Sequence, residues 1–380
     1  MPESPFIAVG GGLAGAAFAL ELARHGAPAL VLESTRAPHH KVCGEFLSAE
    51  AQALAAYLGL DLEAMGATSI ATFRLASGHD QAEAPLPFRG AGLSRHRLDQ
   101  ALLEAAEAAG AEVVRGVTVG EVEPLEGRVI VMAGTRRFKG RAAALATGKH
   151  GLREFPRAPS DMVGFKLQLR VAPDALGRLA DVVQLAMFDG GYVGACIVED
   201  SLVTLCWVMH RTLLQRIGAG WPSQSAYLSQ SSEIVAHLLQ DAVPEWEKPV
   251  AIAAIPYGYL RRHIIAPAIF PVGDQLAVIP SLTGDGMAIA LYSGIAAAQA
   301  VLAGDGADLF QQRLVDRLRP QFRRAGILNR LFDARILHRP SVAFAKALPR
   351  LVTWIAQSTR LRGFEDVMER PKPTRRRLKA

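Results

Sequence analysis

Hydrophobic and polar positions divide the chain into segments of different period. Short apolar runs at residues 6–9 and 28–32 indicate buried strands, and the apolar stretch between them has the length of a helix. Residues 94–109 place apolar side chains at helical spacing, which predicts an amphipathic helix before a strand at 112–119. The start of the chain therefore predicts parallel strands joined by helices.

The middle of the chain follows a strand period instead. Residues 70–90 and 161–210 contain alternating or short apolar runs, which predict successive antiparallel strands. A helical segment at 211–245 comes next, and residues 269–304 return to a strand, a turn and a helix rich in small residues. The end, 308–362, is mostly helical. This order predicts a β-rich block inserted into an α/β domain.

Glycines after the first strand have the spacing of a dinucleotide-binding loop. Gly10 allows a tight turn, Gly12 allows the backbone to approach a pyrophosphate, and Gly15 allows the helix to pack closely on the sheet. The N-terminus of that helix favours phosphates, and an acid at the end of the second strand is placed to bind a ribose. The sequence thus predicts a nucleotide site formed by Gly10, Gly12, Leu13, Ala14, Gly15, Glu33, Ser34 and Arg36.

A second glycine-rich stretch follows the apolar run that begins at Ile269. A Gly–Asp pair at a strand end can direct a carboxylate at a polyol, and a glycine-rich turn opening a helix can direct N–H groups at an electron-rich ring. Those are the requirements of a flavin. The predicted contacts are Gly273, Asp274, Pro280, Gly284, Asp285, Gly286 and Met287.

The two stretches together resemble the FAD-dependent oxidoreductases of the para-hydroxybenzoate hydroxylase and geranylgeranyl reductase superfamily. The segment around Cys43 is similar to that of geranylgeranyl reductases and of members found beside type III polyketide synthases. The resemblance covers about residues 1–50, 92–153 and 256–302. It implies that FAD is the cofactor and that the residues beside it include Cys43, Gly44, Arg95, Thr147 and Gly148.

The resemblance also implies the fold. We expect an α/β class (α+β overall), with a Rossmann-like FAD/NAD(P)-binding domain, an inserted antiparallel β-sheet substrate domain and C-terminal helices. The expected FAD-binding domain is discontinuous and comprises residues 1–75, 91–160 and 256–305. The expected substrate domain comprises 76–90 and 161–255, followed by a helical region at 306–369 and a basic tail at 370–380.

Two departures from the family pattern bear on the reaction. Thr147 stands where monooxygenases of this fold often carry the acid of an Asp-Gly pair, which puts a conventional NADH or NADPH site in doubt. These two nucleotides therefore remain only candidate electron donors. The W-x-W-x-I-P motif of flavin halogenases is absent, because the four tryptophans are isolated at 207, 221, 246 and 354. We therefore do not expect halogenation.

Three residues are candidates for catalysis. Cys43 could orient substrate, form a charge-transfer contact or donate a proton, helped by a positive neighbour such as Lys41, or it could be a small buried residue in a turn. Glu45 could act as an acid or base, or it could support the following helix, whose N-cap is Ser48. Tyr192 could bond a phenol or carbonyl, with Tyr257 as a weaker candidate; alternatively each tyrosine is a packed interface residue.

The leading functional hypothesis is a monooxygenase that hydroxylates an apolar aromatic or polyketide-type substrate through a flavin C4a-hydroperoxide. Apolar positions in the β-rich block suit a hydrophobic small molecule: Leu167, Leu169, Leu185, Met187, Leu205 and Val208. One alternative is an FAD-dependent ene-reductase of polyprenyl chains. Another is a non-catalytic lipid or prenyl carrier on the same fold.

Composition adds limits on partners and location. The charge is +6, and basic residues gather in the tail at 370–380, which is a solvated terminus or a peripheral membrane contact. No aromatic residues interleave them, so nucleic acid is not an expected partner. Three scattered cysteines predict neither a disulfide framework nor a metal site. We expect a cytoplasmic protein, with no transmembrane helix and with membrane-peripheral binding as the alternative.

Overall fold

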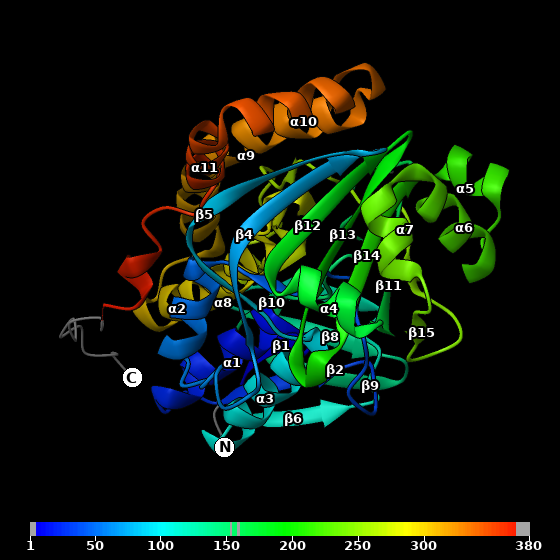
Figure 1. Cartoon of the computed structure of the whole chain (residues 1–380). Coiled ribbons are helices and arrows are strands. Elements are labelled where there is room, and N and C mark those ends of the chain that lie inside the picture. The colour runs from blue at the N-terminus through cyan, green and yellow to red at the C-terminus, as the bar shows by residue number, and fades with distance from the viewer. Residues whose placement is uncertain (1–4, 153, 158–159, 370–380) are drawn as a thin grey trace.

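A five-stranded parallel sheet forms the centre of the first domain. The computed structural model describes residues 5–152, 154–157 and 160–369 of the chain (Figure 1). The strand order is β18-β10-β1-β2-β6, and every neighbouring pair is parallel. The strands are β1 (Phe6–Val9), β2 (Ala29–Glu33), β6 (Glu112–Arg115), β10 (Ala143–Leu145) and β18 (Ile269–Pro271).

Four helices pack around this sheet and beside one another: α1 (Leu13–Arg24), α2 (Ala49–Tyr57), α3 (Arg95–Ala108) and α8 (Gly286–Ala303). α8 approaches α1 closely, because a Cβ atom at Gly294 would lie 2.2 Å from the carbonyl oxygen of Ala14. By length and composition alone α8 is apolar enough to cross a membrane, which corrects the expectation that no segment is. Its packing against α1 in the main hydrophobic cluster makes it a core helix.

A nine-stranded sheet forms the second domain. Its order is β15-β11-β14-β13-β12-β4-β5-β3, and β16 also pairs with β11. The strands are β3 (Phe46–Leu47), β4 (Thr68–Ser77), β5 (Asp80–Gly92), β11 (Met162–Arg170), β12 (Asp181–Phe188), β13 (Gly191–Ile197), β14 (Val203–His210), β15 (Val243–Pro244) and β16 (Val250–Ile252).

The pairing of β4 moves one expected domain boundary. β4 begins at Thr68 and runs parallel to β12, so the whole β4–β5 hairpin belongs to the second sheet. The expected boundary after residue 75 is therefore too late. The local alternation of the hairpin fits an extension of either sheet, and only the pairing of β4 with the distant strand β12 decides between them. The parallel β4–β12 pair also makes this sheet mixed rather than wholly antiparallel.

Smaller elements complete the fold. Two further sheets comprise β7 (Glu121–Leu125), β8 (Arg128–Ala133) and β9 (Arg136–Gly140), and β17 (Tyr259–Leu260) with β19 (Ala277–Val278). Outer helices are α4 (Pro173–Leu179), α5 (Arg211–Ile217), α6 (Trp221–Ser231) and α7 (Glu233–Leu239). The C-terminal helices are α9 (Ala307–Asp333), α10 (His338–Ala347) and α11 (Pro349–Ser358). Short 3₁₀ turns are η1 (Glu199–Ser201), η2 (Gly273–Gln275), η3 (Ser281–Thr283), η4 (Arg335–Leu337) and η5 (Phe364–Val367).

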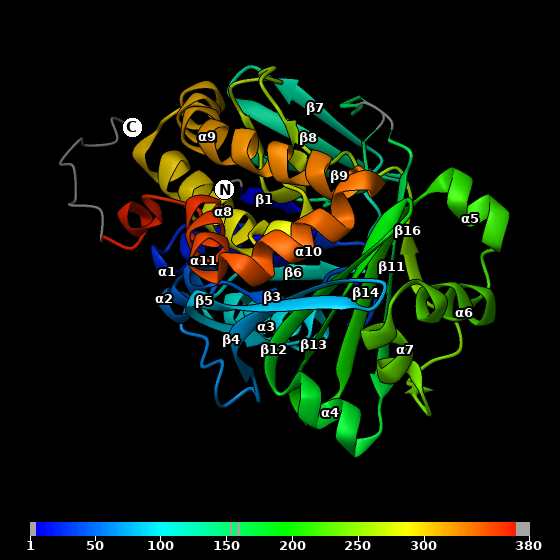
Figure 2. The same cartoon turned by 45° about the horizontal axis from the view of Figure 1, so that its top comes forward.

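The two faces of the nine-stranded sheet pack against different layers. Leu167, Leu169 and Leu205 point away from the first domain and join side chains of α4–α7 in one cluster. Leu185, Met187 and Val208 point to the opposite face, where α9–α11 cover them (Figure 2). Side chains alternate along a strand, so only this second set faces the candidate site. The α/β fold with an inserted sheet and C-terminal helices is confirmed.

Candidate functional site

The loop between β1 and α1 has the close packing that its glycines allow. Gly10 has a φ of +109°, and a Cβ atom there would lie 2.5 Å from the carbonyl oxygen of Ala146. A Cβ atom at Gly15 would lie 1.9 Å from the carbonyl oxygen of Gly10. Gly12 is the N-cap of α1 and supplies no capping side chain, which leaves the helix N-terminus able to receive an anion.

Two cations lie against this helix N-terminus. A Cβ atom at Gly12 would be 3.3 Å from Lys41 Nζ and 3.8 Å from Arg95 Nη2. Asp99 holds both, at 2.8 Å from Lys41 Nζ and 2.6 Å from Arg95 Nε. Burial would raise the pKa of Asp99, but the two cations lower it to about 2, so the carboxylate stays ionised. The net positive charge of this cluster fits a pyrophosphate.

Lys41 is a functional candidate that sequence reasoning assigned elsewhere. The sequence suggests a neighbour that could activate Cys43, whereas the Lys41 ammonium lies at the glycine-rich loop beside Arg95. No motif marks it, because Lys41 and Asp99 are far apart in sequence and meet only when α3 packs beside the loop after β2. Arg95 is the first residue of α3, and its guanidinium lies near the N-terminus of α1.

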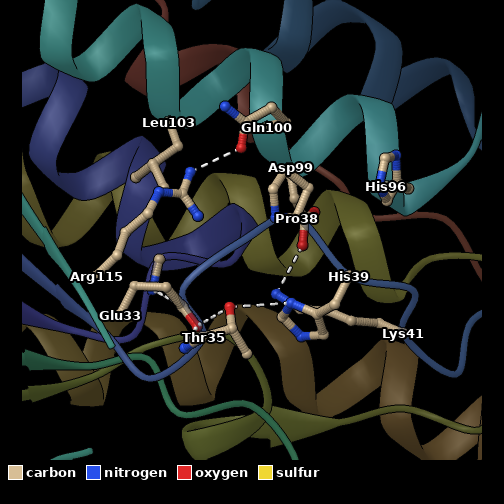
Figure 3. A pocket seen from close by; sticks show the side chains of 11 residues that line it. Glu33, Thr35, Pro38, His39, Lys41, His96, Asp99, Gln100, Leu103 and Arg115 are labelled. Atoms are coloured by element: carbon tan, nitrogen blue, oxygen red, sulfur yellow. Dashed lines mark hydrogen bonds and ion pairs between the residues drawn. The ribbon is translucent and has the colours of Figure 1, made fainter. Parts of the chain in front are cut away.

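Glu33 lines a pocket together with Lys41 and Asp99 (Figure 3). Its carboxylate accepts the Gly11 N–H at 2.7 Å and the Thr35 N–H and hydroxyl at 2.9 Å. Burial alone would raise the pKa of Glu33, but the Thr35 N–H, the charge of Lys41 and the Gly11 N–H together lower it. An ionised carboxylate at this position is suited to accept bonds from a ribose.

The lining of this pocket differs in part from the prediction. Ser34 bonds Glu33 at 3.2 Å but is exposed, and Arg36 packs against Gly116, so neither lines the pocket. The residues that line it are Gly11, Glu33, Thr35, Pro38, His39, Lys41, His96, Asp99, Gln100, Leu103 and Arg115. Most of these come from the loop after β2 and from α3, which the sequence could not place together.

Gly273 and Asp274 form the turn η2 directly after β18, beside the loop that follows β10. Asp274 pairs with Lys149 at 3.2 Å, and the Gly273 N–H donates to Ser293 Oγ at 2.8 Å. The Thr147 hydroxyl donates to the His150 carbonyl at 2.7 Å, and Gln275 donates to Thr147 Oγ1 and to the Gly148 carbonyl. These bonds bring the Thr147–Gly148 and Gly273–Asp274 pairs to the same edge of the sheet.

The stretch from Pro280 to Met287 forms η3 and the first turn of α8. Gly284 has a φ of +70°, and a Cβ atom there would lie 2.8 Å from the Phe46 ring. Asp285 is fully buried and directed away from this turn, pairing with Arg360 at 3.1 Å and accepting the Leu361 N–H at 2.7 Å. Its side chain therefore anchors the C-terminal segment, and a cofactor contact from Asp285 would have to come from its backbone.

Glu45 occupies a place that differs from the predicted acid or base. It is fully buried with a φ of +58°, and its carboxylate forms an ion pair with the equally buried Lys166. It also accepts the Arg95 N–H at 2.7 Å, the Gln168 amide at 3.1 Å and the Thr204 hydroxyl. Because both carboxylate oxygens are engaged, this geometry gives Glu45 a structural role that joins the two domains.

Cys43 lies two residues earlier and is half-buried. Its sulfur accepts the Glu45 N–H at 3.4 Å, and the buried Cys196 donates to the Gly44 carbonyl at 3.3 Å. Burial raises the pKa of the Cys196 and Cys206 thiols, so both are neutral. Ser48 caps α2 through a bond from the Ala51 N–H, which confirms that N-cap.

Tyr192 and Tyr257 meet at Ser281. Tyr192 in β13 donates to Ser281 Oγ at 3.0 Å, and the Tyr257 hydroxyl also bonds Ser281. Burial raises the pKa of both tyrosines, so their hydroxyls are protonated. Both rings pack in the apolar cluster that holds Leu185 and Val208. The cluster therefore joins two phenolic donors to the turn that opens α8.

Comparisons with known proteins agree with this geometry. Residues 3–130 match the family model described as an FAD binding domain. No curated protein matches the sequence.

Solved structures of flavin-dependent halogenases share the fold. Halogenase PltM, solved in complex with phloroglucinol and FAD, has a TM-score of 0.72 at 15% identity, covering 94% of this chain and 85% of its own. Flavin-dependent brominase Bmp2 has a TM-score of 0.76 at 16% identity and covers 94% of each chain. The myxobacterial chondrochloren halogenase CndH has 0.71 at 20% identity, covering 85% of this chain and 80% of its own. Identities this low show the fold and leave the reaction open.

The nucleotide loop, the paired cations and Glu33 thus lie within a segment that independently matches an FAD-binding model. Residues 3–130 match an FAD binding domain, and the chain shares its fold with flavin-dependent halogenases.

Proposed function

We propose that the protein is an FAD-dependent monooxygenase that hydroxylates an apolar aromatic substrate, such as an alkylated phenol of polyketide type. The observation that carries the proposal is the convergence of Tyr192 and Tyr257 on Ser281, inside an apolar cluster and next to the turn that opens α8. A similar fold binds phloroglucinol, a phenol, in halogenase PltM, which supports an aromatic substrate.

The chain's own residues divide into a cofactor-binding set and a substrate-orienting set. Lys41, Arg95 and the α1 N-terminus would hold the pyrophosphate of FAD, and Glu33 would bind its ribose. When bound, FAD would accept two electrons from a donor such as NADH or NADPH and activate dioxygen, one atom entering the substrate and the other leaving as water. That NADH or NADPH binds is also part of the proposal, because Thr147 replaces the acid that monooxygenases of this fold often carry.

The tyrosine pair would orient the substrate. Tyr192, Tyr257 and Ser281 together have three O–H groups, and the bonds among them use two. The third O–H can donate to a phenol or carbonyl oxygen of the substrate. The surrounding side chains, including Leu185, Met187 and Val208, are apolar and would suit a hydrophobic substrate. Cys43 is retained as a candidate for orienting substrate or donating a proton. Wild-type turnover by a Cys43→Ser variant would remove it from that role.

Reduction of a double bond in a polyprenyl chain is the alternative reaction. The half-buried Cys43 thiol favours this reduction, because the Cys43 segment resembles that of geranylgeranyl reductases. The apolar cluster is compatible with it, because a long hydrocarbon needs no phenol-binding group. A non-catalytic lipid carrier is a weaker alternative, because a carrier would not need the phosphate loop, Lys41 and Arg95 in this arrangement.

Turnover with and without oxygen separates these reactions. The purified protein is loaded with FAD, supplied with NADH or NADPH and an alkylresorcinol, and assayed in air and anaerobically, each with and without bromide. The proposal expects a hydroxylated product in air only, and a Tyr192→Phe variant with a raised KM for the phenol and retained FAD. A brominated product would instead assign a halogenase reaction. In a parallel anaerobic assay with a polyprenyl substrate, reduction of that substrate would assign the reductase.

A further inference from the structure

Exposed apolar side chains concentrate on the C-terminal helices. In the described part of the chain twelve large apolar side chains are exposed, and seven of them lie within residues 327–354. They are Ile327 and Leu331 of α9, Ile336 of η4, Phe344 of α10, Leu348, and Leu351 and Trp354 of α11. We call this set the apolar crest. Ile336 is 84% exposed and Trp354 is 64% exposed, and it is the gathering of exposed apolar side chains, not a single one, that marks an interaction surface.

The helices that carry the crest form one outer layer. α10 and α11 lie over the β4–β5 part of the nine-stranded sheet, whereas α9 runs from the first domain, where it packs on α8 and β18, to β13 (Figures 1 and 2). α10 and α11 pack on β5, and η4 joins α9 to α10. Their inner side chains Phe332, Val342 and Val352 belong to the cluster around Tyr192. The three helices thus carry apolar side chains that are buried against the cluster around Tyr192 and others that are exposed.

Basic residues accompany the crest. Residues 323–354 contain seven basic side chains and one acid, Asp333, which is already 3.2 Å from His210. Two of the seven are paired with acids elsewhere, Arg335 with Asp189 and Arg339 with Asp80. The remaining five are Arg323, Arg324, Arg330, Lys346 and Arg350, and all are exposed. Apolar and aromatic side chains flanked by Lys and Arg are typical of helices that lie in the interface of an anionic bilayer.

We propose that the apolar crest of α9–α11 docks the protein on the surface of anionic membranes. Ile336 and Trp354 would enter the headgroup region, while the five cations that form no ion pair within the described residues would contact lipid phosphates. The membrane is favoured over an acidic protein surface because the exposed apolar side chains are spread over three helices and are accompanied by exposed cations. The site is distinct from the basic tail at 370–380, which lies outside the described residues.

Docking through this layer has a consequence that rests on the proposed function. The cluster around Tyr192 would be separated from the bilayer by α9–α11 alone, so an apolar substrate dissolved in lipid would have a short route to it. Membrane binding itself does not depend on turnover. It is therefore tested on the FAD-loaded protein without substrate, and its failure would leave the proposed reaction untouched.

Vesicle flotation tests the proposal. The full chain is mixed with vesicles of phosphatidylcholine, with or without phosphatidylglycerol, and the bound fraction is measured. We expect binding that requires phosphatidylglycerol and falls at high salt. An Ile336→Ser/Trp354→Ser variant should bind about tenfold more weakly, a loss of about 1.4 kcal/mol. The matched control is Leu125→Ser/Val243→Ser, which removes two exposed apolar side chains outside the crest and should bind like the unmodified chain.

Further variants separate the other sources of binding. A Lys346→Gln/Arg350→Gln variant should lose part of the phosphatidylglycerol dependence, and deletion of 370–380 should leave most binding intact. Binding that survives the crest variant but not the tail deletion would overturn the proposal. Dissociation of a dimer by the crest variant, without vesicle binding by the unmodified chain, would instead make the crest an interface between copies. Retained FAD in each variant shows that the variant is folded.

Discussion

At the scale of single residues, two glycines of the loop after β1 serve different purposes: Gly15 is needed for the fold, and Gly12 for binding the cofactor. Gly15 must be glycine for the chain to fold, because its Cβ atom would lie 1.9 Å from a backbone oxygen. Gly12 faces only the flexible ends of Lys41 and Arg95, which can move. A side chain at Gly12 would therefore spare the fold but occupy the space that a pyrophosphate needs.

Gly12→Ala is accordingly expected to fold and to lose FAD. We predict a dissociation constant raised about tenfold or more, equivalent to at least about 1.4 kcal/mol, with little change in unfolding midpoint. Fluorescence titration of FAD and denaturant unfolding measure the two quantities. Gly177→Ala is the control, since nothing lies near a Cβ atom there. Undiminished FAD affinity in Gly12→Ala would contradict the placement of the phosphates.

Glu45 and Lys166 form a buried ion pair whose partners come from different domains. Lys166→Met leaves the Glu45 carboxylate buried without its counter-charge, and we predict a loss of about 3–5 kcal/mol in the free energy of unfolding. Glu45→Gln/Lys166→Met should recover part of that loss, because no unpaired charge remains. Urea unfolding of both variants and of the exposed Lys139→Met control measures this. Equal stability of Lys166→Met and the unmodified chain would exclude the pair as a structural link.

His40 predicts a pH dependence of stability. Its ring stacks on Trp246 at 4.3 Å, and Lys166 Nζ lies 3.4 Å from its Nδ1. Burial, followed by the charges of Lys166, His96 and His39, lowers its pKa from 6.5 to about 4. Because the pKa is lower in the folded state, His40 contributes stability above about pH 6.5 that is lost as the pH falls toward 4.

The thermal unfolding midpoint should therefore fall between about pH 6.5 and 4, and His40→Gln should lessen that fall. The comparison between variant and unmodified chain removes the contribution of the carboxylates that titrate in the same range. An identical pH profile for both would show that His40 is not held in its neutral form by the fold.

At the scale of elements, the sequence predicts best what neighbouring residues decide. The β1–α1–β2 unit, the α3 helix at Arg95 and the α8 helix follow from local period and glycine spacing. The boundary at Thr68 and the face of Leu167 depend on pairings with distant strands, which no local pattern encodes. For the same reason Lys41 and Ser281 became candidates only after the elements had been placed together.

The segment after α11 is held to the start of α8 by a buried pair. Arg360 bonds Asp285 at 3.1 Å and also donates to the Thr283 carbonyl. Removing the cation leaves Asp285 buried and uncompensated, so Arg360→Met should cost about 3–5 kcal/mol and loosen the turn from Pro280 to Met287. Unfolding by urea and limited proteolysis near residue 360 measure both effects, and exposed Arg362→Met is the control. A cost no larger than that of Arg362→Met would contradict the anchor.

At the scale of the whole molecule, the site lies where three layers meet. The parallel sheet supplies the nucleotide loop, the nine-stranded sheet supplies Tyr192, and α9–α11 close the apolar cluster from outside. The resemblance in sequence located the first layer well. It could not locate the layer of α9–α11, because these helices carry no motif. Their role follows only from the contacts of their inner side chains with the cluster around Tyr192.

The most direct test of the proposed reaction follows the oxygen atom. The FAD-loaded protein is supplied with NADH or NADPH and an alkylresorcinol under ¹⁸O-labelled dioxygen, and the product is analysed by mass spectrometry. The account predicts a product that carries one labelled oxygen atom, with FAD retained after turnover. A product without the label would contradict the monooxygenase assignment.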